Sequence, residues 1–166
     1  MCLWKVKIMT DYPWERIEEE TKNFLELIER LQSCNERYVL EESSPIKHSC
    51  DTVRLSAIET LTNKTLEWKR ELLTSLPILE NVWYCLSYGT QEHVYVLVEF
   101  IVNRALEAYL DDSERLDKTM MPSLGSILRC TKEVERAITD MQKIMTQIAE
   151  EFPSGTCTCK SKKDST

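Results

Sequence analysis

The stretch from Ile127 to Phe152 carries apolar or small residues at alternating steps of four and three, and no other feature constrains the fold as strongly. The positions are Ile127, Thr131, Val134, Ile138, Met141, Met145, Ile148 and Phe152. Such spacing places them on one seam of an α-helix, suited to packing at about 20° against nearly parallel or antiparallel neighbours. We expect a helix from Pro122 to Phe152 whose seam packs inside a bundle of this chain rather than in a coiled coil between chains.

Two earlier segments show the same seam, and each has signals for its ends. Asp11 can cap a helix that continues to about Ser33, and Asp51 can cap another that stops at Leu76, because Pro77 disfavours helical geometry in the residue before it. Their seams are Trp14, Ile17, Thr21, Phe24, Ile28 and Leu31, and then Ile58, Leu61, Thr65, Trp68 and Leu72. We expect an irregular connector at 34–49 and a separate short helix at 77–88.

The nearly continuous apolar run from Val94 to Val102 fits a buried strand or a buried helix, because it is rich in β-branched residues. No second strand-like run exists to pair with it, so we favour a central helix at 90–110 that Asp111 interrupts. With only 3 Gly and 5 Pro in 166 residues, the chain has few of the residues that form the tight turns of β-sheet proteins.

The predicted fold class is therefore all-α, a single-domain bundle of about five helices with a buried central helix. The predicted bundle spans residues 11–152. An apolar arm at 1–10 precedes it, and a disordered tail at 153–166 follows it.

Charge and hydropathy argue against binding to nucleic acid and against insertion into a membrane. The formal net charge of −7 opposes binding to nucleic acid. No uncharged apolar run approaches the roughly 18 residues of a membrane-spanning helix, and Leu3–Met9 is shorter than the core of a secretion signal. We expect no membrane span.

The 7 cysteines show neither a disulfide framework nor a metal-finger spacing, which favours reduced thiols and a cytoplasmic or nuclear location. Cys157 and Cys159 lack nearby ligands to complete a tetrahedral metal site. Asn63-Lys64-Thr65 is a formal glycosylation sequon, but inside a predicted helix of a chain without a visible signal it is expected to be a chance occurrence.

Residue patterns for catalysis are missing. His48 and His93 are the only histidines, and neither belongs to a metal-binding pair. No glycine-rich phosphate loop and no nucleophile elbow occurs. We expect a non-enzymatic protein that needs no cofactor and no metal.

The candidate partner-binding residues come from the arm and from the last seam. The arm supplies apolar side chains that a bundle does not obviously need, and methionines make a seam tolerant of several packings. They are Leu3, Trp4, Val6, Ile8, Tyr12, Met141 and Met145. Trp14, Trp68 and Trp83 lie on seams and are expected in the core.

The sequence thus favours a protein–protein interaction module, an adaptor or subunit of an intracellular complex, whose partner and oligomeric state stay open. The length and helix count are also similar to those of secreted four-helix cytokines and of Bcl-2-like bundles. That similarity concerns architecture alone, since the groove motif Asn-Trp-Gly-Arg of Bcl-2 proteins does not occur. A secreted signalling protein and a Bcl-2-like regulator are the alternatives.

Overall fold

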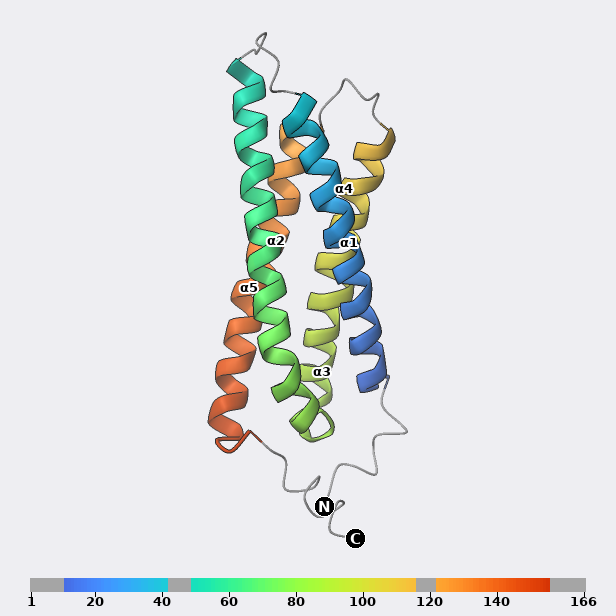
Figure 1. Cartoon of the computed structure of the whole chain (residues 1–166). Helices are drawn as coiled ribbons and strands as arrows, with labels where there is room; N and C mark the ends of the chain where they lie inside the picture. Colours follow the sequence, from blue (N-terminus) through green and yellow to red (C-terminus); the bar gives the residue numbers. More distant parts are fainter. Residues whose placement is uncertain (1–10, 42–48, 116–121, 156–166) are drawn as a thin grey trace.

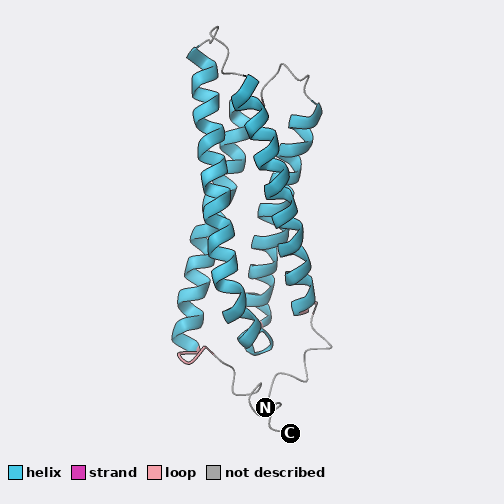
Figure 2. Ribbon diagram, in the orientation of Figure 1, coloured by secondary structure: helices cyan, strands magenta, loops and turns pink. Residues whose placement is uncertain are grey.

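The computed structural model describes residues 11–41, 49–115 and 122–155, which form four long helical rods and no strand (Figures 1 and 2). The rods are α1 (Trp14–Glu41), α2 (Ser49–Val82), a third rod made of α3 (Tyr88–Tyr95), η3 (Val96–Asn103) and α4 (Arg104–Arg115), and α5 (Leu124–Glu151). A single 3-10 turn, η2 (Trp83–Cys85), follows α2. The predicted all-α bundle is confirmed.

The predicted seams face the core. All six seam positions of α1 and all five of α2 are buried, as are Ile127, Thr131, Val134, Ile138, Met141 and Ile148 of α5. Met145 and Phe152 are partly buried against the same core. On α5, Cys130, Ala137 and Ile144 widen the buried stripe, as expected for a helix with neighbours on two sides.

Helix ends account for most differences from the sequence analysis. Helix α2 does not stop at Leu76 but continues through Pro77 to Val82, so the separate helix at 77–88 is replaced by the end of α2, η2 and the start of α3. Helix α1 extends to Glu41, into the expected connector. The interruption expected at Asp111 is also absent, because α4 continues to Arg115.

The ambiguous run from Val94 to Val102 is helical and not a strand. Its middle is a π-helix, η3, a form that is rare in proteins and is commonest at functional sites. The third rod is less enclosed than the expected central helix, because it packs on α1 and α5 and leaves His93 and Arg104 exposed on its outer side.

The rods alternate in direction along the chain, because the connections between them are short. Helix α1 and the third rod run upward in Figure 1, whereas α2 and α5 run downward. Helix α2 packs on α1 and, most extensively, on α5, and the third rod completes the bundle between α5 and α1. Two neighbouring pairs, α2 with α5 and α1 with the third rod, are therefore parallel.

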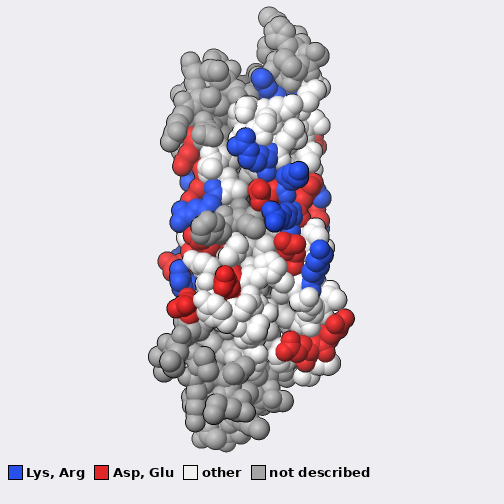
Figure 3. Space-filling model, turned by 180° about the vertical axis from the view of Figure 1, so that it is seen from behind, with Lys and Arg blue, Asp and Glu red and all other residues white. Residues whose placement is uncertain are grey.

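The outer surface carries charges of both signs. On the face opposite to that of Figure 1, acidic and basic side chains alternate with uncharged areas (Figure 3). In the described part of the chain, no helix has the length and hydropathy needed to cross a membrane.

Candidate functional site

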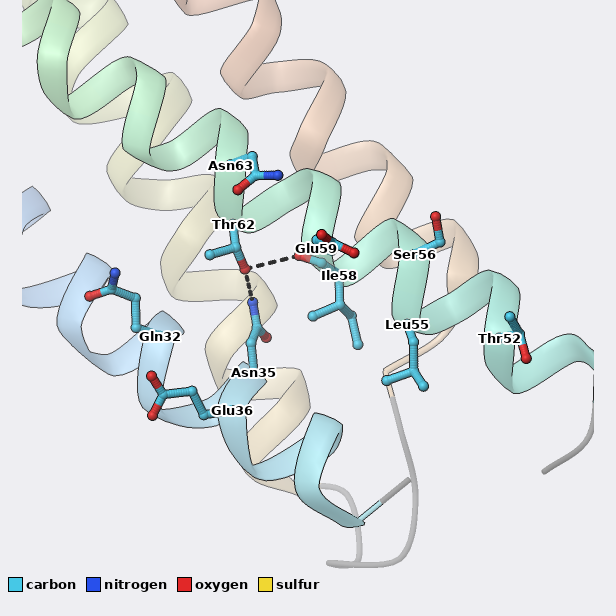
Figure 4. Close-up of a pocket in the computed structure, with 10 residues that line it drawn as sticks. All are labelled: Gln32, Asn35, Glu36, Thr52, Leu55, Ser56, Ile58, Glu59, Thr62 and Asn63. Atoms are coloured by element: carbon cyan, nitrogen blue, oxygen red, sulfur yellow. Dashed lines mark hydrogen bonds between the residues drawn. The ribbon is translucent and has the colours of Figure 1, made fainter. Parts of the chain in front are cut away.

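A cleft of about 830 Å³ lies between the C-terminal half of α1 and the N-terminal half of α2 (Figure 4). Its size falls in the range of ligand-binding pockets. The lining residues are Gln32, Asn35, Glu36, Thr52, Leu55, Ser56, Ile58, Glu59, Thr62 and Asn63. Both helices contribute side chains to its lining.

A hydrogen-bonded group of polar side chains forms the floor of this cleft. Asn35, which is 4% exposed, donates from Nδ2 to Thr62 Oγ1 at 2.8 Å, and Thr62 donates to the Ile58 carbonyl at 2.9 Å. The two side chains point toward each other across the cleft in Figure 4. Tyr109 of α4 donates to Asn35 Oδ1 at 3.1 Å. The floor is therefore held by three helices and is preorganised.

The rim of the cleft is acidic. Glu36 and Glu59 are exposed, and neither carboxylate forms an ion pair within the described part of the chain. No lysine or arginine is among the described residues that line the cleft. The half-buried Leu55 adds apolar surface to the lining. The cleft therefore combines an apolar and amide floor with a negative rim.

A second, smaller cleft of about 430 Å³ lies on the other side of α2, against α5. Thr52 and Ser56 line both clefts. Two of the most exposed large apolar residues, Val53 at 54% and Leu128 at 52%, line this second cleft. The first turns of α2 are therefore flanked by open space on both sides.

The predicted site residue Tyr12 lies at the opposite end of the bundle, in an aromatic cluster. Its ring is 5.4 Å from that of Tyr88 and 5.0 Å from that of Tyr95, and its carbonyl accepts from Trp83 Nε1 at 2.7 Å. Arg16 stacks on Tyr95 at 4.7 Å. Hydrogen bonds to Tyr12 and Asp11 raise the pKa of Tyr88.

The other predicted partner-binding residues are divided among core, seam and undescribed positions. Met141 is fully buried, so in this structure it is a core residue that a partner cannot reach, while Met145 is partly buried against the core. Leu3, Trp4, Val6 and Ile8 lie outside the described residues. Trp14, Trp68 and Trp83 are buried, as expected.

The cysteines contradict one expectation. Cys85 is disulfide-bonded, so the prediction that all thiols are reduced is wrong at this position. Cys34 and Cys130 carry thiols. Among the described residues, no group of three His, Cys, Asp or Glu side chains is arranged to hold a metal ion.

Sequence reasoning missed the cleft because it placed Asn35 and Glu36 in a connector. The only available signal was the polar Thr62, which follows Leu61 next to a seam but does not by itself indicate a cleft. Comparison with known proteins adds no assignment: no family model matches, and neither a curated protein nor a solved structure shows significant similarity.

Proposed function

We propose that this protein is a non-enzymatic protein–protein interaction module and that the α1–α2 cleft receives a partner segment with a basic side chain beside an apolar one. The observation that carries the proposal is the composition of the cleft. Leu55 offers apolar surface, and Glu36 and Glu59 offer carboxylates that form no ion pair within the described part of the chain.

The cleft complements such a segment in charge and in apolar surface, and binding requires little ordering of the cleft itself. A lysine or arginine placed between the two carboxylates gains charge-assisted hydrogen bonds, and its apolar stem covers Leu55. Asn35 is already fixed by Tyr109 and Thr62, so binding does not have to order the floor. Because the rim charges are exposed, they contribute more to association rate and specificity than to affinity.

The test compares two double variants with the same change in charge. A partner recovered by affinity purification of the wild-type protein is titrated against Glu36→Gln/Glu59→Gln and against Glu26→Gln/Glu80→Gln, whose exposed carboxylates do not line the cleft. We expect the first double variant to bind about 2–30-fold more weakly at physiological salt, since each of the two exposed ion pairs contributes about 0.2–1 kcal/mol. Equal affinities of the two double variants would contradict the assignment of the cleft.

The disulfide at Cys85 favours a second candidate function, that of a secreted signalling protein. Disulfides persist in oxidising compartments and are rare in the cytosol, so this bond weighs against the cytoplasmic or nuclear location that the sequence suggested. The alternating direction of the rods differs from the up-up-down-down order of growth-hormone-like cytokines. The second candidate is therefore a secreted bundle of different connectivity.

Mass spectrometry of protein from its natural source distinguishes the two locations. Thiols are blocked before lysis, and the peptide that contains Cys85 is then analysed without reduction. A cross-linked peptide supports the extracellular candidate, whereas a blocked Cys85 thiol supports the intracellular adaptor.

A further inference from the structure

The chain contains one N-glycosylation sequon, Asn63-Lys64-Thr65, and α2 places its acceptor asparagine on the surface. Asn63 is exposed at the rim of the α1–α2 cleft. Figure 4 draws no hydrogen bond from its amide to Asn35 or Thr62. No hydrogen bond holds this amide within the described part of the chain. A large group on Asn63 Nδ2 is therefore compatible with the folded bundle.

The disulfide at Cys85 is an independent observation that favours use of the sequon. By itself, a sequon in a helix is most often a chance occurrence. Disulfide formation and N-glycosylation both take place in the lumen of the secretory pathway, however, and Cys85 is disulfide-bonded. A chain that acquires this bond there also exposes its sequon to the glycosylation machinery.

The folded structure fixes when the modification takes place. Thr65 is fully buried, and its hydroxyl donates to the Thr62 carbonyl at 2.7 Å, so the third residue of the sequon is not accessible in the bundle. An enzyme that reads the whole sequon needs an extended segment. Modification must therefore precede the folding of α2, while the chain is still entering the lumen.

We propose that Asn63 carries an N-linked glycan at the rim of the α1–α2 cleft. In the reaction, Asn63 Nδ2 loses one proton and forms a bond to the anomeric carbon of an oligosaccharide. The bond between that carbon and a lipid pyrophosphate carrier breaks, and the carrier leaves with the bonding electrons. The glycan then borders the cleft on the side of α2. This inference goes beyond the proposed interaction function and depends on the secreted candidate.

The first test uses protein from its natural source, analysed by intact mass before and after treatment with peptide N-glycosidase. We expect the mass to fall by one glycan and Asn63 to become aspartate in the treated peptide. A mass equal to that of the unmodified polypeptide, unchanged by the enzyme, overturns the proposal. That result would not bear on the proposed binding function of the cleft, because binding of the Glu36 and Glu59 variants is measured separately.

Three variants assign the site when the full chain is directed to the lumen of cultured cells. Asn63→Gln removes the acceptor, and Thr65→Val removes the hydroxyl while keeping the branched shape of a buried residue. Both should lose the enzyme-sensitive mass completely, whereas Thr65→Ser should retain it. The purified, folded and unmodified protein should accept no glycan in vitro. Enzyme-sensitive mass on Asn63→Gln contradicts the assignment of the site, and modification of the folded protein contradicts the conclusion that modification precedes the folding of α2.

Discussion

Replacement of Ile138 by Asp tests the central seam of the bundle. Ile138 lies in the middle of α5 and is 5% exposed. The positions one turn away on the same face, Val134 and Met141, are also buried. The variant therefore removes a branched apolar side chain and places a carboxylate among apolar neighbours.

The expected loss of stability has two parts. Complete burial of an isoleucine side chain contributes about 1.5–3 kcal/mol, and an unpaired polar group in such a position costs roughly 2–7 kcal/mol. The combined loss of about 5 kcal/mol or more compares with a total stability of about 5–15 kcal/mol for a domain. We expect Ile138→Asp to be unfolded or close to unfolding at 25 °C.

The assay is urea denaturation followed by circular dichroism, with two controls on the same helix. Glu135→Lys changes an exposed residue and should shift the free energy of unfolding by no more than about 0.5 kcal/mol. Ile138→Val should cost about 1 kcal/mol. If Ile138→Asp is as mild as Glu135→Lys, the burial assigned to α5 is wrong, and with it the bundle.

Three further changes test other parts of the structure. Pro77 is exposed inside α2 and cannot donate a backbone hydrogen bond, so Pro77→Ala should stabilise the protein by about 1–3 kcal/mol in the same denaturation assay. Asn35→Ala breaks the hydrogen bonds to Thr62 and from Tyr109 and should cost about 1–3 kcal/mol, more than Thr62→Val. Burial raises the pKa of the Cys130 thiol to about 12, so peptide mass spectrometry should show alkylation of Cys130 by iodoacetamide at pH 8 only after unfolding.

The seams were predictable because the helical period alone decides which residues share a face. Steps of three and four place Ile17, Phe24 and Leu31 on one side of α1, whatever the neighbouring helix is. All three are fully buried. The same reasoning fails at the margins of a stripe. Leu73 follows the seam residue Leu72 but is 46% exposed, because the width of the buried stripe depends on where the neighbouring helices lie.

Helix ends were less predictable, because local signals compete with packing. Pro77 predicts a helix end, yet Leu79 and Val82 are fully buried beyond it, and their burial compensates for the missing hydrogen bond. Capping signals vary in the same way: Asp51, expected as a cap, lies inside α2, whereas Ser123 accepts from the Ser126 backbone N–H at 3.2 Å and starts α5 close to the expected position.

The candidate site could not be predicted at all from residue order. The cleft lies between α1 and α2, and its shape depends on how the two helices pack on the rest of the bundle. Asn35 and Thr62 are 27 positions apart, and only the fold brings them within a hydrogen bond. In the sequence, Thr62 does not differ from any other threonine beside a seam. Its role becomes visible only when the fold places Asn35 opposite to it.

The π-helical segment η3 supports a last prediction, which concerns a buried carboxylate. Glu99 is 8% exposed, and its Oε1 is 3.2 Å from Arg104 Nη2, five positions ahead, the spacing of one π turn. Glu99 Oε2 and Asn103 Oδ1 are buried and find no hydrogen-bond partner among the residues that the structure describes. The carboxylate is thus removed from water with only one of its oxygens bound, so its contribution to stability is small or unfavourable.

The two ends of this ion pair should therefore respond in opposite directions. Glu99→Leu removes the poorly solvated charge and should leave the free energy of unfolding unchanged or raise it by about 1 kcal/mol, because apolar replacements of buried ion pairs are often neutral or stabilising. Arg104→Ala leaves the Glu99 carboxylate without a partner and should lower the Tm, an effect that Glu99→Leu should abolish in the double variant. Glu107→Leu, which removes the exposed partner of the same arginine, should change little and serves as the control. A loss of more than about 1 kcal/mol in Glu99→Leu would refute this reasoning, since it would mean that a bound donor satisfies Glu99 Oε2 in solution.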